Sequence, residues 1–167
     1  AHIVYANLIG GQDELVFDGG SFVLNGDCSL AAQQPMFVED IQLTEWRRDA
    51  DGWAVTLTER VEHPEGYEAI YCAMALGLRD YVNKNGFPGV VLGMSGGIDS
   101  ALTAAVAVDA LGPDRVRCVM MPSPYTSCDS LEDASLAAEM LGVTLDDVGI
   151  GPAISAFNQM LAPIFGD

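Results

Sequence analysis

Residues 95 to 100 read Ser-Gly-Gly-Ile-Asp-Ser, a set of residue types suited to binding a phosphate group. Gly96 and Gly97 lack a Cβ atom, so they can take positive φ and let an anion approach the backbone closely. Ser95 and Ser100 each offer a hydroxyl donor. Asp99 would repel a phosphate unless a divalent cation lies between them. The hexapeptide therefore predicts a nucleotide bound with Mg²⁺, and Asp99 as the metal ligand.

The elements around this hexapeptide are those that a phosphate site needs. An apolar run at 90–92 precedes it and a helix-like stretch at 101–111 follows it. In such a turn the backbone N–H groups point outward, and the helix dipole adds partial positive charge. The turn is not a Walker A loop, since the only lysine, Lys84, lies upstream, and its glycine spacing is not that of a dinucleotide fold. The alternative is an ordinary strand-to-helix turn with two glycines.

Beyond residue 63 the hydrophobic pattern alternates between helix and strand. It predicts helix 67–84, strand 89–94, helix 97–111, strand 115–120, helix 130–141, strand 143–148 and helix 152–161. Alternation at this spacing favours right-handed βαβ crossovers and a parallel sheet. Ligands of such sheets lie beyond the carboxyl ends of the strands, where both the hexapeptide and residues 121–125 are expected.

The first 60 residues read instead as mostly β. We expect one buried strand over 3–9 that is broken by Gly10-Gly11. Strands 15–17 and 21–24 are expected to be joined by a turn, and strands 41–48 and 53–60 by a hairpin loop. Both ends of the chain look cut, which indicates a piece of a longer polypeptide.

Composition limits the classes of partner. The chain has 167 residues, half of them apolar, and a formal net charge of −17, so it should fold but repel nucleic acid and anionic membrane. No apolar run is long enough for a transmembrane helix. The cysteines are scattered without a CxxC pair, which argues against structural zinc and favours a reducing cytoplasm. They are Cys28, Cys72, Cys118 and Cys128.

Three stretches together carry a resemblance to a known family. The hexapeptide resembles the pyrophosphatase loop of the ATP pyrophosphatases. With Gly93 and Met94 before it, and with 120–127 and 130–134 after it, it looks like the synthetase domain of NAD⁺ synthetases. Residues 10–21 resemble the later part of a nitrilase-type amidase domain. The combination resembles the glutamine-dependent NAD⁺ synthetases, in which the two domains are fused.

The resemblance implies an α/β protein made of two partial domains. Residues 1–62 would be the C-terminal portion of a nitrilase-like α/β sandwich. Residues 63–167 would be the N-terminal portion of the synthetase domain, with a parallel Rossmann-like sheet of the adenine nucleotide alpha hydrolase type and flanking helices. The family further implies a homo-oligomer acting on small molecules, and the cytoplasmic location follows from the scattered cysteines described above.

The resemblance also implies the chemistry. ATP adenylates the nicotinate carboxylate of deamido-NAD⁺ and releases pyrophosphate, and ammonia from glutamine then displaces AMP to give NAD⁺. Mg²⁺ would be bound by Asp99, and Met120 and Met121 would lie near the adenine, although plain core positions are as good an explanation for these two methionines. The ATP phosphates would be held by Gly93, Met94, Ser95, Gly96, Gly97, Ile98, Asp99 and Ser100.

Several features leave alternatives open. Nothing matches the Glu-Lys-Cys triad of nitrilase-type glutaminases, and Cys28 reads as a packing or surface thiol, so the chain alone is expected to lack glutaminase activity and not to make NAD⁺. Ser130 with Asp133 reads more readily as a helix-capping pair than as ligand contacts. Thr126 and its neighbours either order a loop over the site or face solvent. Another amidating or thiolating ATP pyrophosphatase, or a nucleotide-binding module without turnover, remains an alternative function.

Overall fold

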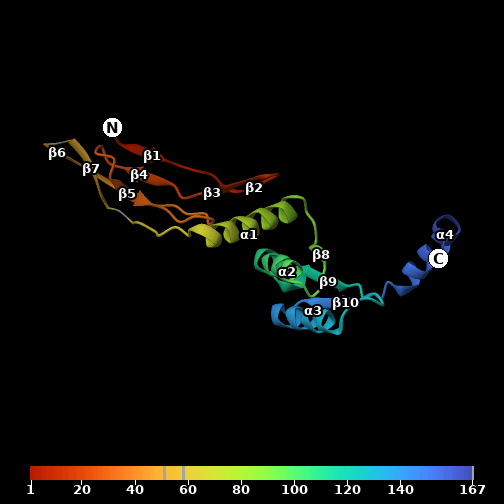
Figure 1. The fold of residues 1–167 in the computed structure, drawn as a ribbon. Helices are drawn as coiled ribbons and strands as arrows, with labels where there is room; N and C mark the ends of the chain where they lie inside the picture. The colour runs from red at the N-terminus through yellow and green to blue at the C-terminus, as the bar shows by residue number, and fades with distance from the viewer. Residues whose placement is uncertain (51, 58, 167) are drawn as a thin grey trace. The chain divides into compact units, whose positions relative to one another are not determined.

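The computed structural model describes residues 1–50, 52–57 and 59–166. The chain divides into two compact units, Ala1–Lys84 and Asn85–Asp167 (Figure 1). Asp51 and Thr58, which belong to the strand pair predicted near residue 50, lie outside the described residues, as does Asp167. The alternation of strands with helices in the second unit gives the α/β class that the sequence predicts.

The first unit consists of short antiparallel strands followed by one long helix. These are β1 (Ile3–Tyr5), β2 (Ile9–Gln12), β3 (Leu15–Asp18), β4 (Phe22–Leu24), β5 (Leu30–Gln33), β6 (Glu45–Asp49), β7 (Gly52–Leu57) and α1 (Gly66–Lys84). The strands form a sheet of order β1-β4-β5 and the pairs β2-β3 and β6-β7. Val23, Ala31 and Ala32 form a small buried cluster, against which Trp46 and Val55 pack.

The predicted strand over 3–9 is wrong, because Asn7 interrupts it. The Asn7 side-chain amide donates to Asp18 Oδ1 at 3.0 Å and to the Gly19 carbonyl at 2.9 Å. These bonds hold Asn7 in the unpaired stretch between β1, which pairs with β4, and β2, which pairs with β3. Gly10 and Gly11 do not break a strand but lie inside β2. The β1 side chains are exposed rather than buried.

Pairing in this unit also differs from the expectation. β3 and β4 are consecutive strands, but β3 pairs with β2, and β4 pairs with β1 and β5. The β6-β7 hairpin is found, although it begins at Glu45 and residue Ile41 is almost fully exposed. Local turn residues predict where the chain bends, but not which strand edge it pairs with.

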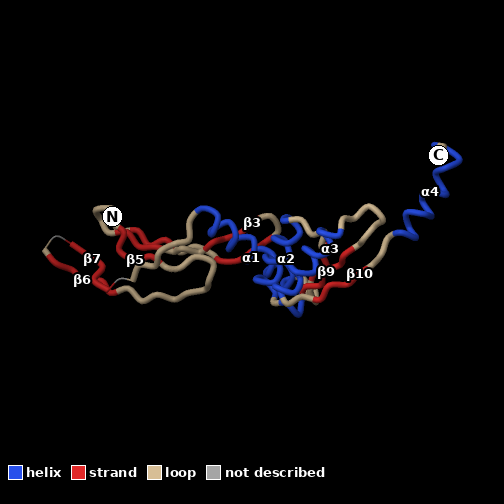
Figure 2. Tube along the Cα trace, turned by 60° about the horizontal axis from the view of Figure 1, so that its bottom comes forward, coloured by secondary structure: helices blue, strands red, loops and turns tan. Residues whose placement is uncertain are grey.

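The second unit has the predicted alternation of strand and helix. Its elements are β8 (Val90–Gly93), α2 (Ile98–Leu111), a short 3₁₀ turn (Pro113–Arg115), β9 (Val116–Met120), α3 (Cys128–Leu141), β10 (Thr144–Asp147) and α4 (Gly151–Phe165). The three strands form a parallel sheet, as predicted, and the structure gives their order as β10-β9-β8. Helices α2 and α3 pack on this sheet (Figure 2). Their buried side chains are small and include Ala104, Ala107 and Ala134.

Capping residues explain where α3 begins and ends. Gly142 takes the left-handed conformation after α3, and its N–H bonds back to the carbonyl of Ala138, a common helix stop. At the other end the cap is Ser127, whose Oγ accepts from the Ser130 N–H at 3.2 Å. The predicted capping pair of Ser130 with Asp133 is therefore wrong, because α3 starts at Cys128, two residues earlier than expected.

The described part of the chain holds no helix that combines the length and the apolar character needed to cross a bilayer. Helix α4 is apolar but has no buried residue, and Phe157, Met160 and Ile164 are all more than half exposed.

The entry into β8 depends on a close backbone contact. A Cβ atom at Gly89 would lie 2.3 Å from the carbonyl oxygen of Arg115. The Arg115 guanidinium donates from Nε to the Pro88 carbonyl and from Nη2 to the Phe87 carbonyl, each at 2.9 Å. These contacts fix the start of the strand that carries the predicted phosphate loop.

We therefore expect Gly89→Ala to destabilise the protein by about 1–3 kcal/mol, because the added methyl group must displace backbone. Chemical denaturation followed by circular dichroism measures the loss. The matched control is Gly149→Ala, since nothing lies within 4 Å of a Cβ atom there. Equal stability of the two variants would contradict the packing described for Gly89.

Candidate nucleotide site at the end of the parallel sheet

The turn between β8 and α2 is ordered by its own serines. The Ser95 N–H donates to Ser100 Oγ at 3.2 Å, and the Ser100 hydroxyl donates to the Gly97 carbonyl at 2.9 Å. Ser95 Oγ lies 3.0 Å from Ser100 Oγ and accepts from the Gly97 N–H at 3.3 Å. The two hydroxyls predicted as ligand donors are thus used inside the turn, where they fix its shape.

The two glycines have different roles in the turn. Gly96 has a φ of +81°, and a Cβ atom there would lie 2.2 Å from the Ser130 carbonyl oxygen on α3. Gly97 precedes α2 with a φ of −87°, so the expectation of positive φ holds only for Gly96. A Cβ atom at Gly97 would lie 3.4 Å from Ser95 Oγ, which is ordinary contact. Gly96 therefore serves packing, whereas Gly97 keeps open the space in front of the helix.

The N-terminus of α2 has no side-chain cap, since the N-cap residue is Gly97. The first amides of a helix have no partner within the helix, and the dipole places partial positive charge there. Ile98, Asp99 and Ser100 form this first turn, and the Ile98 and Asp99 side chains are exposed. Such an end attracts an anion, and phosphate is the usual one.

Asp99 alone provides too few oxygen ligands for Mg²⁺, so the residues present fit the ion only if nucleotide phosphates supply further ligands. Within the described residues, no group of three or more His, Cys, Asp or Glu side chains gathers to hold a metal ion. Mg²⁺ is commonly bound through one or two carboxylates together with substrate phosphates. The exposed carboxylate of Asp99 beside the uncapped helix end suits that arrangement.

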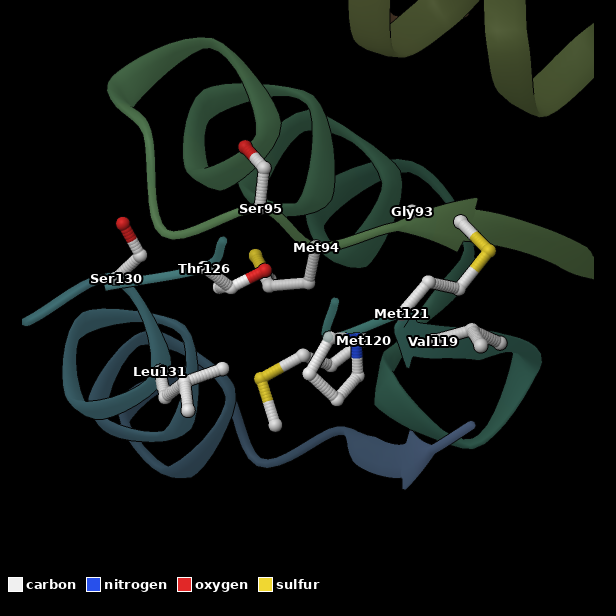
Figure 3. Close-up of a pocket in the computed structure, with 10 residues that line it drawn as sticks. Gly93, Met94, Ser95, Val119, Met120, Met121, Thr126, Ser130 and Leu131 are labelled. Carbon is white, nitrogen blue, oxygen red and sulfur yellow. The ribbon is translucent and has the colours of Figure 1, made fainter. Parts of the chain in front are cut away.

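A cavity of about 230 Å³ lies beside the turn, at the carboxyl ends of β8 and β9 (Figure 3). It brings together five of the predicted site residues, which are Gly93, Met94, Ser95, Met120 and Met121. Met94 is buried, and its N–H extends the sheet by donating to the Val119 carbonyl at 2.9 Å. Gly96, Gly97, Ile98, Asp99 and Ser100 do not line the cavity but continue the same turn beside it.

Other residues complete the cavity walls, and the sequence did not single them out as ligand contacts. They are Val119, Pro122, Thr126, Ser130 and Leu131. Figure 3 shows the side chains of Met120, Thr126 and Leu131 gathered around the hollow. Thr126 Oγ1 accepts from the Ser123 N–H at 2.9 Å, so Thr126 both orders the loop and faces the site. The sequence signal for Thr126 was its position just after β9, at the carboxyl end of the sheet. No such signal exists for Leu131, because only the packing of α3 brings its side chain to the cavity.

Side-chain cations in this unit are already used elsewhere. Residues 85–167 contain two arginines and no lysine. Arg115 holds the Phe87 and Pro88 carbonyls, and Arg117 forms a bidentate ion pair with Asp146 across β9 and β10. The hydrogen bond from Arg117 holds the pKa of Asp146 below its ordinary value. A phosphate at the turn would thus meet backbone amides, not cationic side chains of this unit.

Cys28 lies in the first unit, in a tight turn closed by a hydrogen bond from its N–H to the Asn25 carbonyl at 3.0 Å. It is exposed, has a φ of +67°, and no disulfide. This position agrees with the surface-thiol interpretation.

Comparison with known proteins gives the family. A family model described as NAD synthase matches residues 70–164. A glutamine-dependent NAD(+) synthetase of Rhodobacter capsulatus is 49% identical over 97% of this chain, which covers 29% of that protein. The corresponding enzyme of Acinetobacter baylyi is 45% identical over 99% of this chain, which covers 30% of it.

A solved structure gives the same result. Glutamine-dependent NAD+ synthetase from Acinetobacter baumannii, in complex with ADP, matches with a TM-score of 0.92 and 48% identity over 99% of this chain and 31% of that chain. The present chain spans about 30% of the length of the curated relatives that it matches. With a family model matching more than half of its residues, the chain belongs to the NAD synthase family.

Proposed function

We propose that this chain is the ATP-binding part of a glutamine-dependent NAD⁺ synthetase. The observation that carries the proposal is the uncapped end of α2 at Gly97, next to an apolar cavity at the ends of two parallel strands. The ADP complex of the Acinetobacter baumannii relative supports an adenine nucleotide as the ligand. A cavity of about 230 Å³ suits one part of a nucleotide rather than the whole, since ligand pockets usually span ~300–1,000 Å³.

The two ends of ATP would meet different surroundings. The adenine would enter the cavity, between Met120 and Leu131 and against Met94. The phosphates would lie over Gly97 and accept from the first-turn amides of α2. In this arrangement an apolar slot holds the base while backbone dipoles face the charge.

The reaction would proceed in two steps. The nicotinate carboxylate of deamido-NAD⁺ attacks the α-phosphorus of ATP, the bond to the β-phosphate oxygen breaks, and pyrophosphate leaves. Ammonia then attacks the acyl carbon of the adenylate, and AMP departs with the bonding electron pair while ammonia loses a proton. The turn amides would stabilise charge that develops on the departing pyrophosphate. Mg²⁺ held by Asp99 would neutralise part of the same charge.

The test is product formation by the full-length protein. With ATP and deamido-NAD⁺, we expect NAD⁺, AMP and pyrophosphate in equal amounts when either glutamine or ammonium is supplied, measured by chromatography. Omission of deamido-NAD⁺ should abolish pyrophosphate release. Binding of ATP without any turnover would overturn the proposal in favour of a nucleotide-binding module.

Asp99→Asn in the full-length protein should lower NAD⁺ formation by about 100-fold, the size of loss that follows removal of one preorganised charge-stabilising group. Loss of one exposed charge should leave folding nearly unchanged. Asp114→Asn, an exposed acid at the start of a 3₁₀ turn, is the matched control. Near wild-type turnover of Asp99→Asn would rule out the metal role.

Gly97→Val separates ligand binding from folding, because the backbone there suits any residue. We expect an unchanged unfolding midpoint but at least a tenfold weaker ATP affinity, about 1.4 kcal/mol, by titration calorimetry. Gly96→Ala should instead lower both the unfolding midpoint and the ATP affinity, since its methyl group would meet the Ser130 backbone. Unchanged ATP affinity of Gly97→Val would disprove phosphate binding at this helix end.

A further inference from the structure

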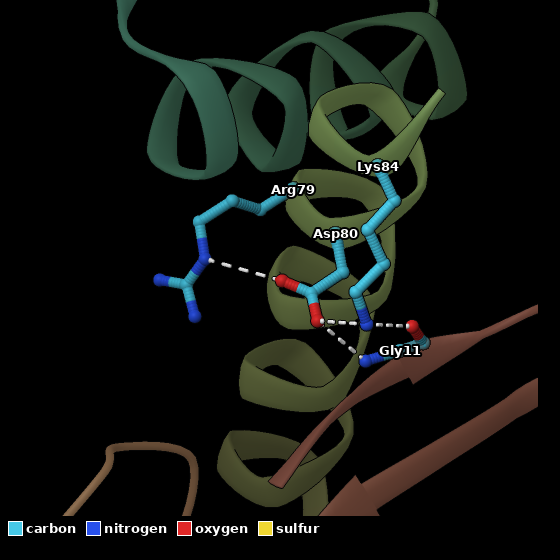
Figure 4. A network of polar contacts seen from close by, with 4 residues as sticks. All are labelled: Gly11, Arg79, Asp80 and Lys84. Atoms are coloured by element: carbon cyan, nitrogen blue, oxygen red, sulfur yellow. Dashed lines mark hydrogen bonds and ion pairs between the residues drawn. The ribbon is translucent and has the colours of Figure 1, made fainter. Parts of the chain in front are cut away.

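A second polar arrangement, outside the nucleotide site, lies in the first unit between β2 and α1 (Figure 4). The Gly11 N–H donates to Asp80 Oδ2 at 2.8 Å, and Lys84 Nζ donates to the Gly11 carbonyl at 2.7 Å. Asp80 Oδ2 and Lys84 Nζ are 3.0 Å apart, and Arg79 Nε lies 4.0 Å from Asp80 Oδ1. We call the contact of Asp80 and Lys84 with Gly11 the clasp.

The clasp takes the place of a neighbouring strand. β2 pairs with β3 on one side, where Gly11 lies opposite Val16. Both backbone groups of Gly11 bond to α1 side chains and not to another strand. The Asp80 carboxylate does the work of a strand carbonyl and the Lys84 ammonium that of a strand N–H. An open strand edge is thereby satisfied by two charged side chains one helical turn apart.

The glycines around the clasp allow this contact. A Cβ atom at Gly11 would lie 2.9 Å from the Gly77 Cα atom, and one at Gly10 would lie 2.8 Å from Asp80 Oδ2. A Cβ atom at Gly77 would lie 3.2 Å from a Val16 methyl group. Strand and helix backbones therefore approach more closely than side chains would permit. The Asp80 side chain is only 20% exposed in this contact.

The clasp joins two parts of the sequence that resemble different protein domains. β2 belongs to the stretch that resembles a nitrilase-type amidase, whereas α1 lies from Ile70 onward within the residues matched by the NAD synthase model. Helix α1 then leads through residues 85–89 into β8 and the phosphate turn. The side chains that hold β2 are thus on the helix that precedes the nucleotide site.

We propose that Asp80 and Lys84 are positioning residues, which fix the amidase portion on the first helix of the synthetase portion and so are needed to deliver ammonia from glutamine. The inference rests on the proposed function. Neither residue touches ATP or the acceptor in this scheme. Synthesis from free ammonia should therefore not need the clasp, whereas synthesis from glutamine should.

The carboxylate form of Asp80 is the form that the clasp needs. Burial raises the pKa of Asp80, but the hydrogen bonds from Lys84 and from the Gly11 N–H outweigh it and lower the pKa below the ordinary value. Arg79 and Lys84 face Asp80 from α1, and β2 carries no charged side chain. Beside the clasp, Glu39 lines a small cavity together with Arg79 and Asp80.

A carboxyl group with a lowered pKa stabilises the folded state above its unfolded pKa of about 3.9, and this stabilisation is lost as pH falls through the folded pKa. The destabilisation caused by Asp80→Asn should therefore be largest near neutral pH and should fade below about pH 4. Denaturation of wild type and variant across this range measures it. A difference that does not depend on pH would contradict the charged clasp.

The decisive experiment compares two ammonia sources in the full-length protein. In Asp80→Asn and in Lys84→Gln, NAD⁺ formation with glutamine should fall about tenfold or more, because small misplacements of reacting groups cost up to ~10²-fold. Formation with saturating ammonium should stay near wild type, and glutamine hydrolysis should continue without matching NAD⁺. The double variant should lose no more than Asp80→Asn alone, since both side chains hold the same glycine.

Glu68→Gln is the matched control, because it removes a charge from the exposed first turn of the same helix. The inference is overturned if, in both clasp variants, the ratio of glutamine-dependent to ammonium-dependent activity stays at the wild-type value. This holds whether both activities are unchanged or both fall equally, and an equal fall would mark a purely structural contact. Absence of NAD⁺ from either source in the wild type would instead refute the proposed function. The two failures are therefore distinguishable.

Discussion

The second unit depends on one backbone contact, between the turn at Gly96 and the first residues of α3 at Ser130. No side chain fits between them, so the turn and the start of α3 are held as a single body. The turn then leaves the N-terminus of α2 uncapped, while α3 supplies Leu131 and Ser130 to the cavity wall. The sites proposed for the phosphates and for the base are consequently set by the same contact.

If ATP binds as proposed, this strongly acidic chain holds a polyanion without using its side-chain cations. The two arginines of the second unit are tied to carbonyls and to Asp146, so they stabilise the sheet and its entry loop. Attraction for phosphate must come from oriented amides, which carry no net charge and need no counterion when the site is empty. Cations at the site would otherwise be drawn to the many carboxylates of the protein. In the first unit Lys84 is likewise engaged, between Asp80 and the Gly11 carbonyl.

Much of the second unit could be predicted from the sequence, because its signals are local. Apolar runs, glycine stops and helical spacing give β8 to α4 within a few residues, and alternation gives the parallel sheet. The first unit was harder, since its strands are short and pair out of sequence order. Asn7 was predicted inside a strand but lies between β1 and β2, where its amide binds Asp18 and Gly19, and Gly10-Gly11 was predicted to break a strand but lies within β2.

The sequence by itself determined the glycine and serine turn at residues 95–100, its place after a strand, and the order of strands and helices along the chain, because each depends on neighbouring residues. It also gave the family resemblance that the comparisons confirm. Only the tertiary structure decided which glycine serves packing, which residues of α3 reach the cavity, and that Gly11 meets Asp80 and Lys84. Those facts join residues far apart in the chain, such as Gly96 with Ser130, and no local pattern encodes a distance between them.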